Sequence, residues 1–187
     1  MQKVDRDKFL FAIQGPLGPF SDSQKEALSA LLDCLESDND MADLSWCAYA
    51  LATSYWETGK TFRPIEEYGK GAGHSYGVPD SVTGQAYYGR GFIQMTWKSN
   101  YMQFGKTLGI DLVNHPELAL QPDVAYKIMS TGMRHGSFTG VGLAKYFNDT
   151  MSDAVNARKI INGLDQAERI AGYYADILKA LQESQTV

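Results

Sequence analysis

Carboxylates in the first third of the chain are the side chains best suited to catalysis. Glu57 lies at the end of a predicted helix, directly after the segment 53–56, which holds Tyr55 and Trp56. The negative end of the helix dipole disfavours an anion there, and a partly dry aromatic setting raises the pKa of a carboxyl group. A raised pKa is what a general acid needs.

Two further acidic residues, Glu66 and Glu67, follow across a turn that contains Pro64. Adjacent side chains of an extended segment point in opposite directions, so only one of the two can face Glu57. Two carboxylates from different elements that face one groove can cleave a glycosidic bond. The alternative is that Glu57 is a solvated helix end and that Glu66 and Glu67 form a surface pair.

Side chains suited to sugar binding are concentrated between residues 87 and 101. Amides and hydroxyls can bond sugar hydroxyls, and the C–H face of a sugar packs on an aromatic ring. On a helix that begins near Thr96, Trp97 and Tyr101 form one i,i+4 row, and Thr96 and Asn100 form another. The alternative for the first row is packing in the core.

Several other kinds of site are excluded or not supported. The chain has 17 basic and 22 acidic residues and a net charge of -5, which disfavours binding to nucleic acid. Gly-Lys-Thr occurs at 59–61 and 105–107 without the earlier glycine of a phosphate-binding loop. The three histidines lack metal-ligand spacing. No metal or other cofactor is implied.

The patterns predict a mainly α fold in a single domain over residues 1–187. A helical part at 1–40 precedes a Gly- and Tyr-rich lobe at 60–95, a loop or β-hairpin insertion that would line a glycan groove. Capping residues, prolines and apolar spacing predict helices at about 5–13, 21–37, from Asp40 to near Gly59, 97–108, from Pro116, from Pro122, 151–162 and 165–183.

The segment from Tyr88 to Tyr101 resembles the signature of glycoside hydrolase family 19, which contains chitinases and many bacteriophage endolysins. The resemblance covers roughly residues 43–175. Its further matches are Trp56-Glu57-Thr58, Ile161-Asn162-Gly163 and the segment that begins with Arg169. The N-terminal part, with the helix at 21–37, resembles the endolysin branch.

This resemblance implies an inverting hydrolase of β-1,4-linked N-acetylated sugars with a lysozyme-like, mainly α (α+β) fold. Glu57 matches the general acid, and Glu67 matches the base that activates water, with Glu66 as the fallback. Arg169 matches a residue that pairs with the acids. The residues expected to bind substrate or hold the water are Tyr88, Gln94, Thr96, Trp97, Asn100 and Asn162.

We therefore expect an endolysin-type glycoside hydrolase that cleaves bacterial peptidoglycan and lyses the host cell. The loop between the acids is short, and residues 57–106 hold six basic against four acidic side chains. Both features suit peptidoglycan, whose stem peptides carry carboxylates. The alternatives are a chitinase and a non-catalytic glycan-binding module. The bond cleaved, on the muramic or the glucosamine side, stays open.

The N-terminus, with Lys3, Asp5, Arg6, Asp7 and Lys8, lacks the apolar stretch of a signal peptide, and no apolar run is long enough to span a membrane. We expect a monomer made in the host cytoplasm that acts on the cell wall in the periplasm. A separate, holin-type pore protein would release it.

Overall fold

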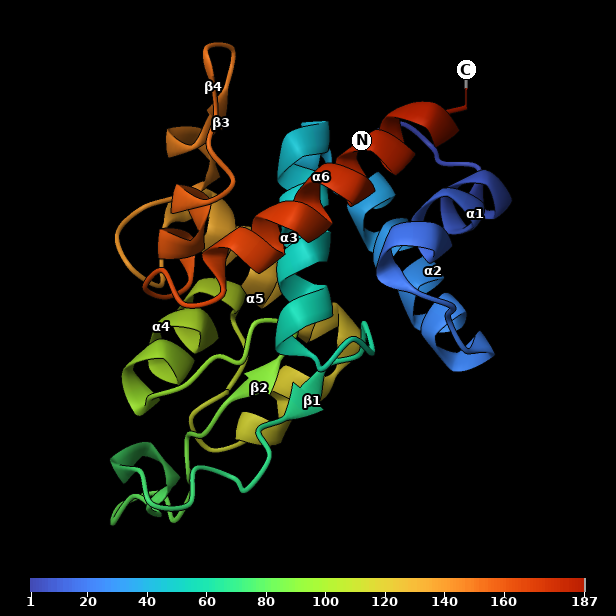
Figure 1. Ribbon diagram of the computed structural model, residues 1–187. Helices are drawn as coiled ribbons and strands as arrows, with labels where there is room; N and C mark the ends of the chain where they lie inside the picture. Colours follow the sequence, from blue (N-terminus) through green and yellow to red (C-terminus); the bar gives the residue numbers. More distant parts are fainter. Residues whose placement is uncertain (187) are drawn as a thin grey trace.

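A computed structural model describes residues 1–186 (Figure 1). The fold is mainly helical, as the sequence predicts. Its α-helices are α1 (Arg6–Leu17), α2 (Asp22–Ser37), α3 (Leu44–Glu57), α4 (Lys98–Leu108), α5 (Pro122–His135) and α6 (Ala167–Ser184). Its strands are β1 (Ile65–Glu66), β2 (Arg90–Gly91), β3 (Phe147–Asn148) and β4 (Met151–Ser152). The 3-10 helices are Asn39–Met41, Ser75–Gly77, Pro116–Leu120, Leu143–Lys145 and Asn156–Ile160.

Helix α3 is the centre of the molecule, and its C-terminal end carries Glu57. Every residue from Cys47 to Tyr55 is buried, because small and apolar side chains occupy all faces of this helix. Helix α6 crosses α3, and α1 packs on α6 in turn (Figure 1). Most of the buried hydrophobic side chains, from Val4 to Leu181, belong to one hydrophobic cluster. Glu57 therefore projects from a rigid support.

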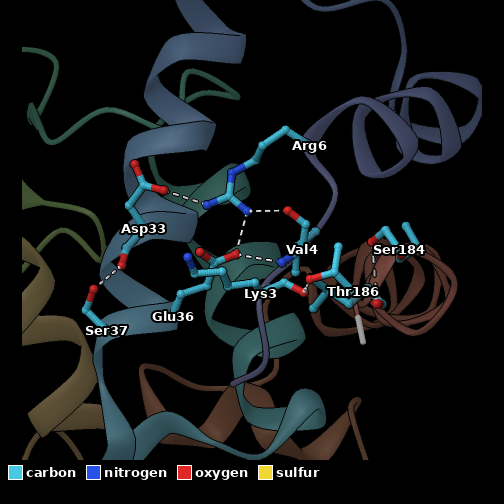
Figure 2. Close-up of polar contacts among 10 residues, drawn as sticks. Lys3, Val4, Arg6, Asp33, Glu36, Ser37, Ser184 and Thr186 are labelled. Atoms are coloured by element: carbon cyan, nitrogen blue, oxygen red, sulfur yellow. Dashed lines mark hydrogen bonds and ion pairs between the residues drawn. The ribbon is translucent and has the colours of Figure 1, made fainter.

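The first residues are tied to α2 by a polar clasp around Arg6 (Figure 2). The Arg6 guanidinium donates to Glu36 and to Asp33, at 2.5 Å each, and to the Val4 carbonyl at 3.0 Å. The Val4 amide donates to Glu36 as well, at 2.8 Å. The amide of Thr186 bonds the neighbouring Lys3 carbonyl, which brings the C-terminal segment to the same place.

The Gly- and Tyr-rich lobe forms loops around a short antiparallel pair of strands. In this pair β1 lies beside β2, with Glu66 opposite Arg90 and Ile65 opposite Gly91. Gly91 has a φ of +88°, and a Cβ there would lie 3.1 Å from the Ala119 carbonyl oxygen, so a side chain would not fit easily. In Figure 1 this pair lies near the C-terminal end of α3.

Several predicted helices are confirmed. Helix α2 begins at Ser21 with the predicted capping box to Gln24, and α4, α5 and α6 lie near their predicted ranges. Helix α1 runs four residues further than predicted, with Pro16 in its last turn.

Two local predictions are wrong. Asp43, and not Asp40, caps α3, since its carboxylate accepts the amides of Ser45 and Trp46. The helix predicted to begin at Pro116 is present as a five-residue 3-10 helix, which ends at Leu120 because Gln121 precedes Pro122 and is held extended.

The second wrong prediction is the helix at 151–162. This range starts as strand β4, and only Asn156–Ile160 is helical, as a 3-10 turn. The Asp153 carboxylate accepts both the amide and the side-chain nitrogen of Asn156. Such a bond competes with a regular α-helix. Within residues 1–186, no helix is long and apolar enough to cross a membrane.

Candidate active site

Glu57 is the last residue of α3, and its side chain is largely buried, with 15% exposed. Its Oε1 atom accepts a hydrogen bond from the Nη1 atom of Arg158 at 2.6 Å. The Arg158 side chain is only 3% exposed, and its Nε atom donates to the Asp165 carbonyl at 3.0 Å. This arrangement fixes both the carboxyl group and the guanidinium that faces it.

Burial raises the pKa of Glu57 above its ordinary value, although the charge and the hydrogen bond of Arg158 act in the opposite direction. Nearby Asp165 adds to the upward shift of this pKa. A carboxyl group with a raised pKa retains its proton to higher pH, so Glu57 has the property that a general acid requires.

Glu57 lines a cavity of about 310 Å³ with a largely polar wall. The cavity brings Glu57 together with five of the predicted substrate-binding residues, four from the segment 94–100 and one from residue 162, far from Glu57 in the chain. These five are Gln94, Thr96, Trp97, Asn100 and Asn162. Its apolar lining consists of Ile93, Met95, Phe138 and Ile161.

The segment between β2 and α4 presents these side chains in an unusual backbone conformation. Gln94 and Trp97 have φ angles of +53° and +73°, which residues other than glycine rarely adopt. The side-chain nitrogen of Gln94 donates to the carbonyls of Ile65 and Gly91, and that of Asn100 donates to the Thr96 carbonyl. Strained residues cluster at functional sites, where the surrounding structure holds them in place.

Glu66 lies in β1 and is engaged by three neighbouring groups. Its Oε1 atom accepts the Tyr88 hydroxyl at 2.7 Å, and its Oε2 atom pairs with Lys70 Nζ at 3.1 Å. Arg90 Nε lies 3.9 Å from Oε1. The Tyr88 hydrogen bond is the largest cause that lowers the pKa of Glu66, so this carboxylate is ionised and held in place.

Glu67 points to a different set of partners. Its Oε1 atom accepts the Tyr76 hydroxyl at 3.0 Å, and its Oε2 atom accepts the Gly89 amide at 2.9 Å. A Cβ on Gly89 would lie 3.3 Å from the Cβ of Glu67 and 2.9 Å from Oε1 of Gln94. Gly89 thus separates Glu67 from Gln94, which lines the Glu57 cavity.

Neither Glu66 nor Glu67 is itself among the described residues that line the Glu57 cavity. Glu67 adjoins it through Gln94 and through Tyr76, whose ring meets Trp97 edge to face at 5.2 Å between centroids. Glu66, by contrast, contacts the buried side chains of Tyr88 and Arg90. The opposite orientation of the two carboxylates agrees with the alternation expected of an extended segment.

Tyr88 and Arg169 require corrections. Tyr88 is expected to bind sugar, but it is buried, with Arg90 over its ring at 3.6 Å, and its hydroxyl is directed to Glu66. Arg169 is expected to pair with the acids, but its guanidinium lies over the Trp56 ring at 5.1 Å. Arg158 makes the ion pair with Glu57 instead, because it lies on the 3-10 turn that approaches the end of α3.

Sequence reasoning missed Arg158, which is 101 residues away from Glu57 in the chain. The only signal was its place four residues before Asn162, which is predicted to bind sugar. Within the described residues, no group of three or more His, Cys, Asp or Glu side chains is arranged to hold a metal ion.

Comparison with known proteins finds a family whose sequence pattern covers most of these site residues. Residues 40–131 match the family model described as chitinase class I, of glycoside hydrolase family 19. This range contains Glu57, both candidate bases and the segment from Tyr88 to Tyr101. In this range the chain is similar to glycoside hydrolase family 19.

Solved structures and curated relatives extend the family comparison. Chitinase C from Streptomyces griseus HUT6037 is 26% identical, with a TM-score of 0.57 over 98% of this chain and 78% of that one. Endochitinase A2 of Pisum sativum is 48% identical over 47 residues, which are 25% of this chain and 14% of the relative. Inactive chitinase-like protein 1 of Hevea brasiliensis is 57% identical over 35 residues, 19% of this chain and 11% of the relative. The chain thus spans only a small share of the curated relatives that it matches.

Proposed function

We propose that this protein is a glycoside hydrolase that cleaves β-1,4 bonds between N-acetylated sugars by acid and base catalysis. The observation that carries the proposal is Glu57, a largely buried carboxyl group with a raised pKa in the wall of a polar cavity. The amide and hydroxyl groups of that cavity suit sugar hydroxyls and acetamido groups. The similarity of residues 40–131 to glycoside hydrolase family 19 supports the same chemistry.

In this mechanism Glu57 gives its proton to the leaving glycosidic oxygen. Arg158 fixes the orientation of the carboxyl group and stabilises the carboxylate that remains after proton transfer. An ionised second carboxylate removes a proton from the attacking water on the opposite face of the sugar, which inverts the anomeric configuration.

We assign the second role to Glu67, with Glu66 as the alternative. Glu67 adjoins Gln94 and Trp97 of the cavity through Gly89 and Tyr76. Glu66 is bound by Tyr88 and Lys70. If the assignment is correct, Glu67→Gln lowers the rate by about 10²-fold or more, and Glu66→Gln lowers it less. The opposite order would assign the base to Glu66.

We further propose that the substrate is bacterial peptidoglycan, and that the protein is an endolysin that lyses its host. The short connection from Glu57 to Glu67 and the local excess of basic side chains in residues 57–106 support this choice. Synthesis in the host cytoplasm, release by a holin-type pore and action as a monomer in the periplasm belong to the same proposal.

Two other functions have specific support. The matched relatives named endochitinases favour chitin as the substrate. The similarity to a protein named as an inactive chitinase-like protein favours a glycan-binding module without catalysis. The three functions, a peptidoglycan hydrolase, a chitinase and a glycan-binding module, are distinguished by one experiment. The wild type and Glu57→Gln are each incubated with purified peptidoglycan and with chitin.

Mass spectrometry of the released fragments provides the measurement. Release of reducing muropeptides by the wild type, but not by Glu57→Gln, supports the proposal. The sugar at the reducing end of these fragments identifies the bond that is cleaved. Release of chitin oligosaccharides alone indicates a chitinase. Binding of either polymer without release by the wild type indicates a binding module.

A further inference from the structure

A second cavity lies on the other side of Trp97 from the Glu57 cavity. It measures about 270 Å³ and shares with the first only Trp97. Its lining combines aromatic rings with one ion pair and comes from the Gly- and Tyr-rich lobe and the start of α4. The lining residues are Ser75, Tyr76, Val78, Pro79, Asp80, Tyr87, Trp97 and Lys98.

Trp97 forms the ridge between the two cavities. Its side chain is 49% exposed, although its backbone is fixed by a hydrogen bond from its amide to the Tyr87 carbonyl at 2.9 Å. Tyr76 supports the ring from the side of the second cavity. A ligand bound beside Glu57 can therefore extend over this indole into the second cavity.

Lys98 supplies the charge in the second cavity. Its Nζ atom donates to Oδ2 of Asp80 at 2.7 Å, and its side chain is 40% exposed. The other oxygen of Asp80 accepts the amides of Val82 and Thr83, so this carboxylate is used to fold its own loop. A lysine ammonium has three donors, and Asp80 is its one hydrogen-bond partner within residues 1–186. Two N–H donors are thus available to an anionic ligand.

We propose that this cavity binds a carboxylate of the peptidoglycan stem peptide through Lys98. This inference rests on the proposed function. It identifies the part of peptidoglycan, the stem peptide, that distinguishes this substrate from chitin. Stem peptides branch from the muramic acid residues of the glycan and carry free carboxylates, whereas chitin has neither. A glycan strand beside Glu57 would place such a branch near Trp97, and Lys98 would select strands that retain their peptides.

Two variants with opposite expected effects test this subsite. Lys98→Gln removes the cation, and Asp80→Asn removes the anion that competes for it but retains the oxygen that accepts Val82 and Thr83. Lys106→Gln, at an exposed position in the last turn of α4, is the matched control. Each protein is assayed on intact peptidoglycan and on the same glycan after an amidase has removed its peptides.

The measured quantity is the ratio of the rate on intact glycan to the rate on stripped glycan. We expect Lys98→Gln to lower this ratio by about fivefold, since a half-exposed charge-assisted bond contributes modestly. Asp80→Asn should raise the ratio, and Lys106→Gln should leave it unchanged. If Lys98→Gln and Asp80→Asn change the ratio in the same direction, or if neither changes it, the inference is wrong. The ion pair between Lys98 and Asp80 would then only stabilise the fold.

A binding measurement separates this inference from the proposed function. Titration calorimetry compares a soluble disaccharide tetrapeptide with the disaccharide alone, in the wild type and in the three variants. A wild type that hydrolyses neither polymer refutes the proposed activity, and the calorimetry still tests the subsite. A wild type that hydrolyses both glycans with a ratio unaffected by Lys98→Gln refutes the subsite alone.

Discussion

Replacement of Arg158 by Met should both destabilise the protein and change the protonation of Glu57. The two side chains are 3% and 15% exposed and meet at 2.6 Å, so the substitution leaves a carboxylate in a largely buried position without its cation. Loss of one partner of a buried ion pair costs about 3–5 kcal/mol. With about 2–4 °C of melting temperature per kcal/mol for a chain of this size, we expect a decrease of about 6–20 °C at pH 7.

The destabilisation should depend on pH in a defined direction. Burial already raises the pKa of Glu57, and removal of Arg158 takes away the interactions that oppose this shift. The folded variant then binds a proton more tightly than the unfolded chain does. Its free energy of unfolding, measured with urea, should be higher at pH 5 than at pH 7, because protonation relieves the unpaired charge.

Enzymatic activity provides a second measurement on the same variant. The alkaline limb of the pH profile of kcat/KM reports the pKa of an essential acid in the free enzyme. In Arg158→Met this limb should move to higher pH. The control is Arg169→Met, because Arg169 lies over Trp56 and makes no hydrogen bond or ion pair with Glu57 within residues 1–186. A limb that stays in place in Arg158→Met, or moves to lower pH, would refute the role assigned to this ion pair.

Two further substitutions test the support of the site and of the fold. Gly89→Ala places a methyl group 2.9 Å from Oε1 of Gln94 and 3.3 Å from the Glu67 side chain. We expect this variant to hydrolyse the glycan at least tenfold more slowly, with the circular dichroism spectrum of the wild type. Wild-type activity would contradict the proposed arrangement. Arg6→Ala opens the clasp between the N-terminus and α2 and should lower the free energy of unfolding by about 1–2 kcal/mol in urea, whereas the exposed Lys8→Ala should change it by less than about 0.5 kcal/mol.

The sequence predicts those parts of the site that lie in contiguous motifs. Gln94, Thr96, Trp97 and Asn100 are close in the chain, so a single turn and the helix after it bring them to one cavity. Glu57 is predictable for a similar reason, since the local pattern determines where α3 ends. The helices with clear caps or apolar spacing are likewise near their predicted positions.

The remaining features depend on contacts between distant segments. Arg158 reaches Glu57 only because the 3-10 turn at 156–160 comes close to the end of α3 in the folded chain. The sequence predicts that turn as part of a longer helix, and the hydrogen bond that the Asn156 amide donates to the Asp153 carboxylate is a local competitor of a regular α-helix. The burial of Tyr88 likewise could not be predicted from the sequence. Its aromatic ring suits sugar binding, and only the folded structure shows that Arg90 lies over it.

The central claim is that Glu57 donates a proton to the leaving oxygen, and leaving-group dependence tests it most directly. Glu57→Gln should lower the rate on a natural glycan by 10²-fold or more (~3 kcal/mol in the barrier). On a dinitrophenyl glycoside of the same sugars, whose leaving group departs without protonation, the variant should retain most of the wild-type rate of bond cleavage. Equal losses on both substrates, or no loss on the natural glycan, would contradict the assignment of Glu57 as the general acid.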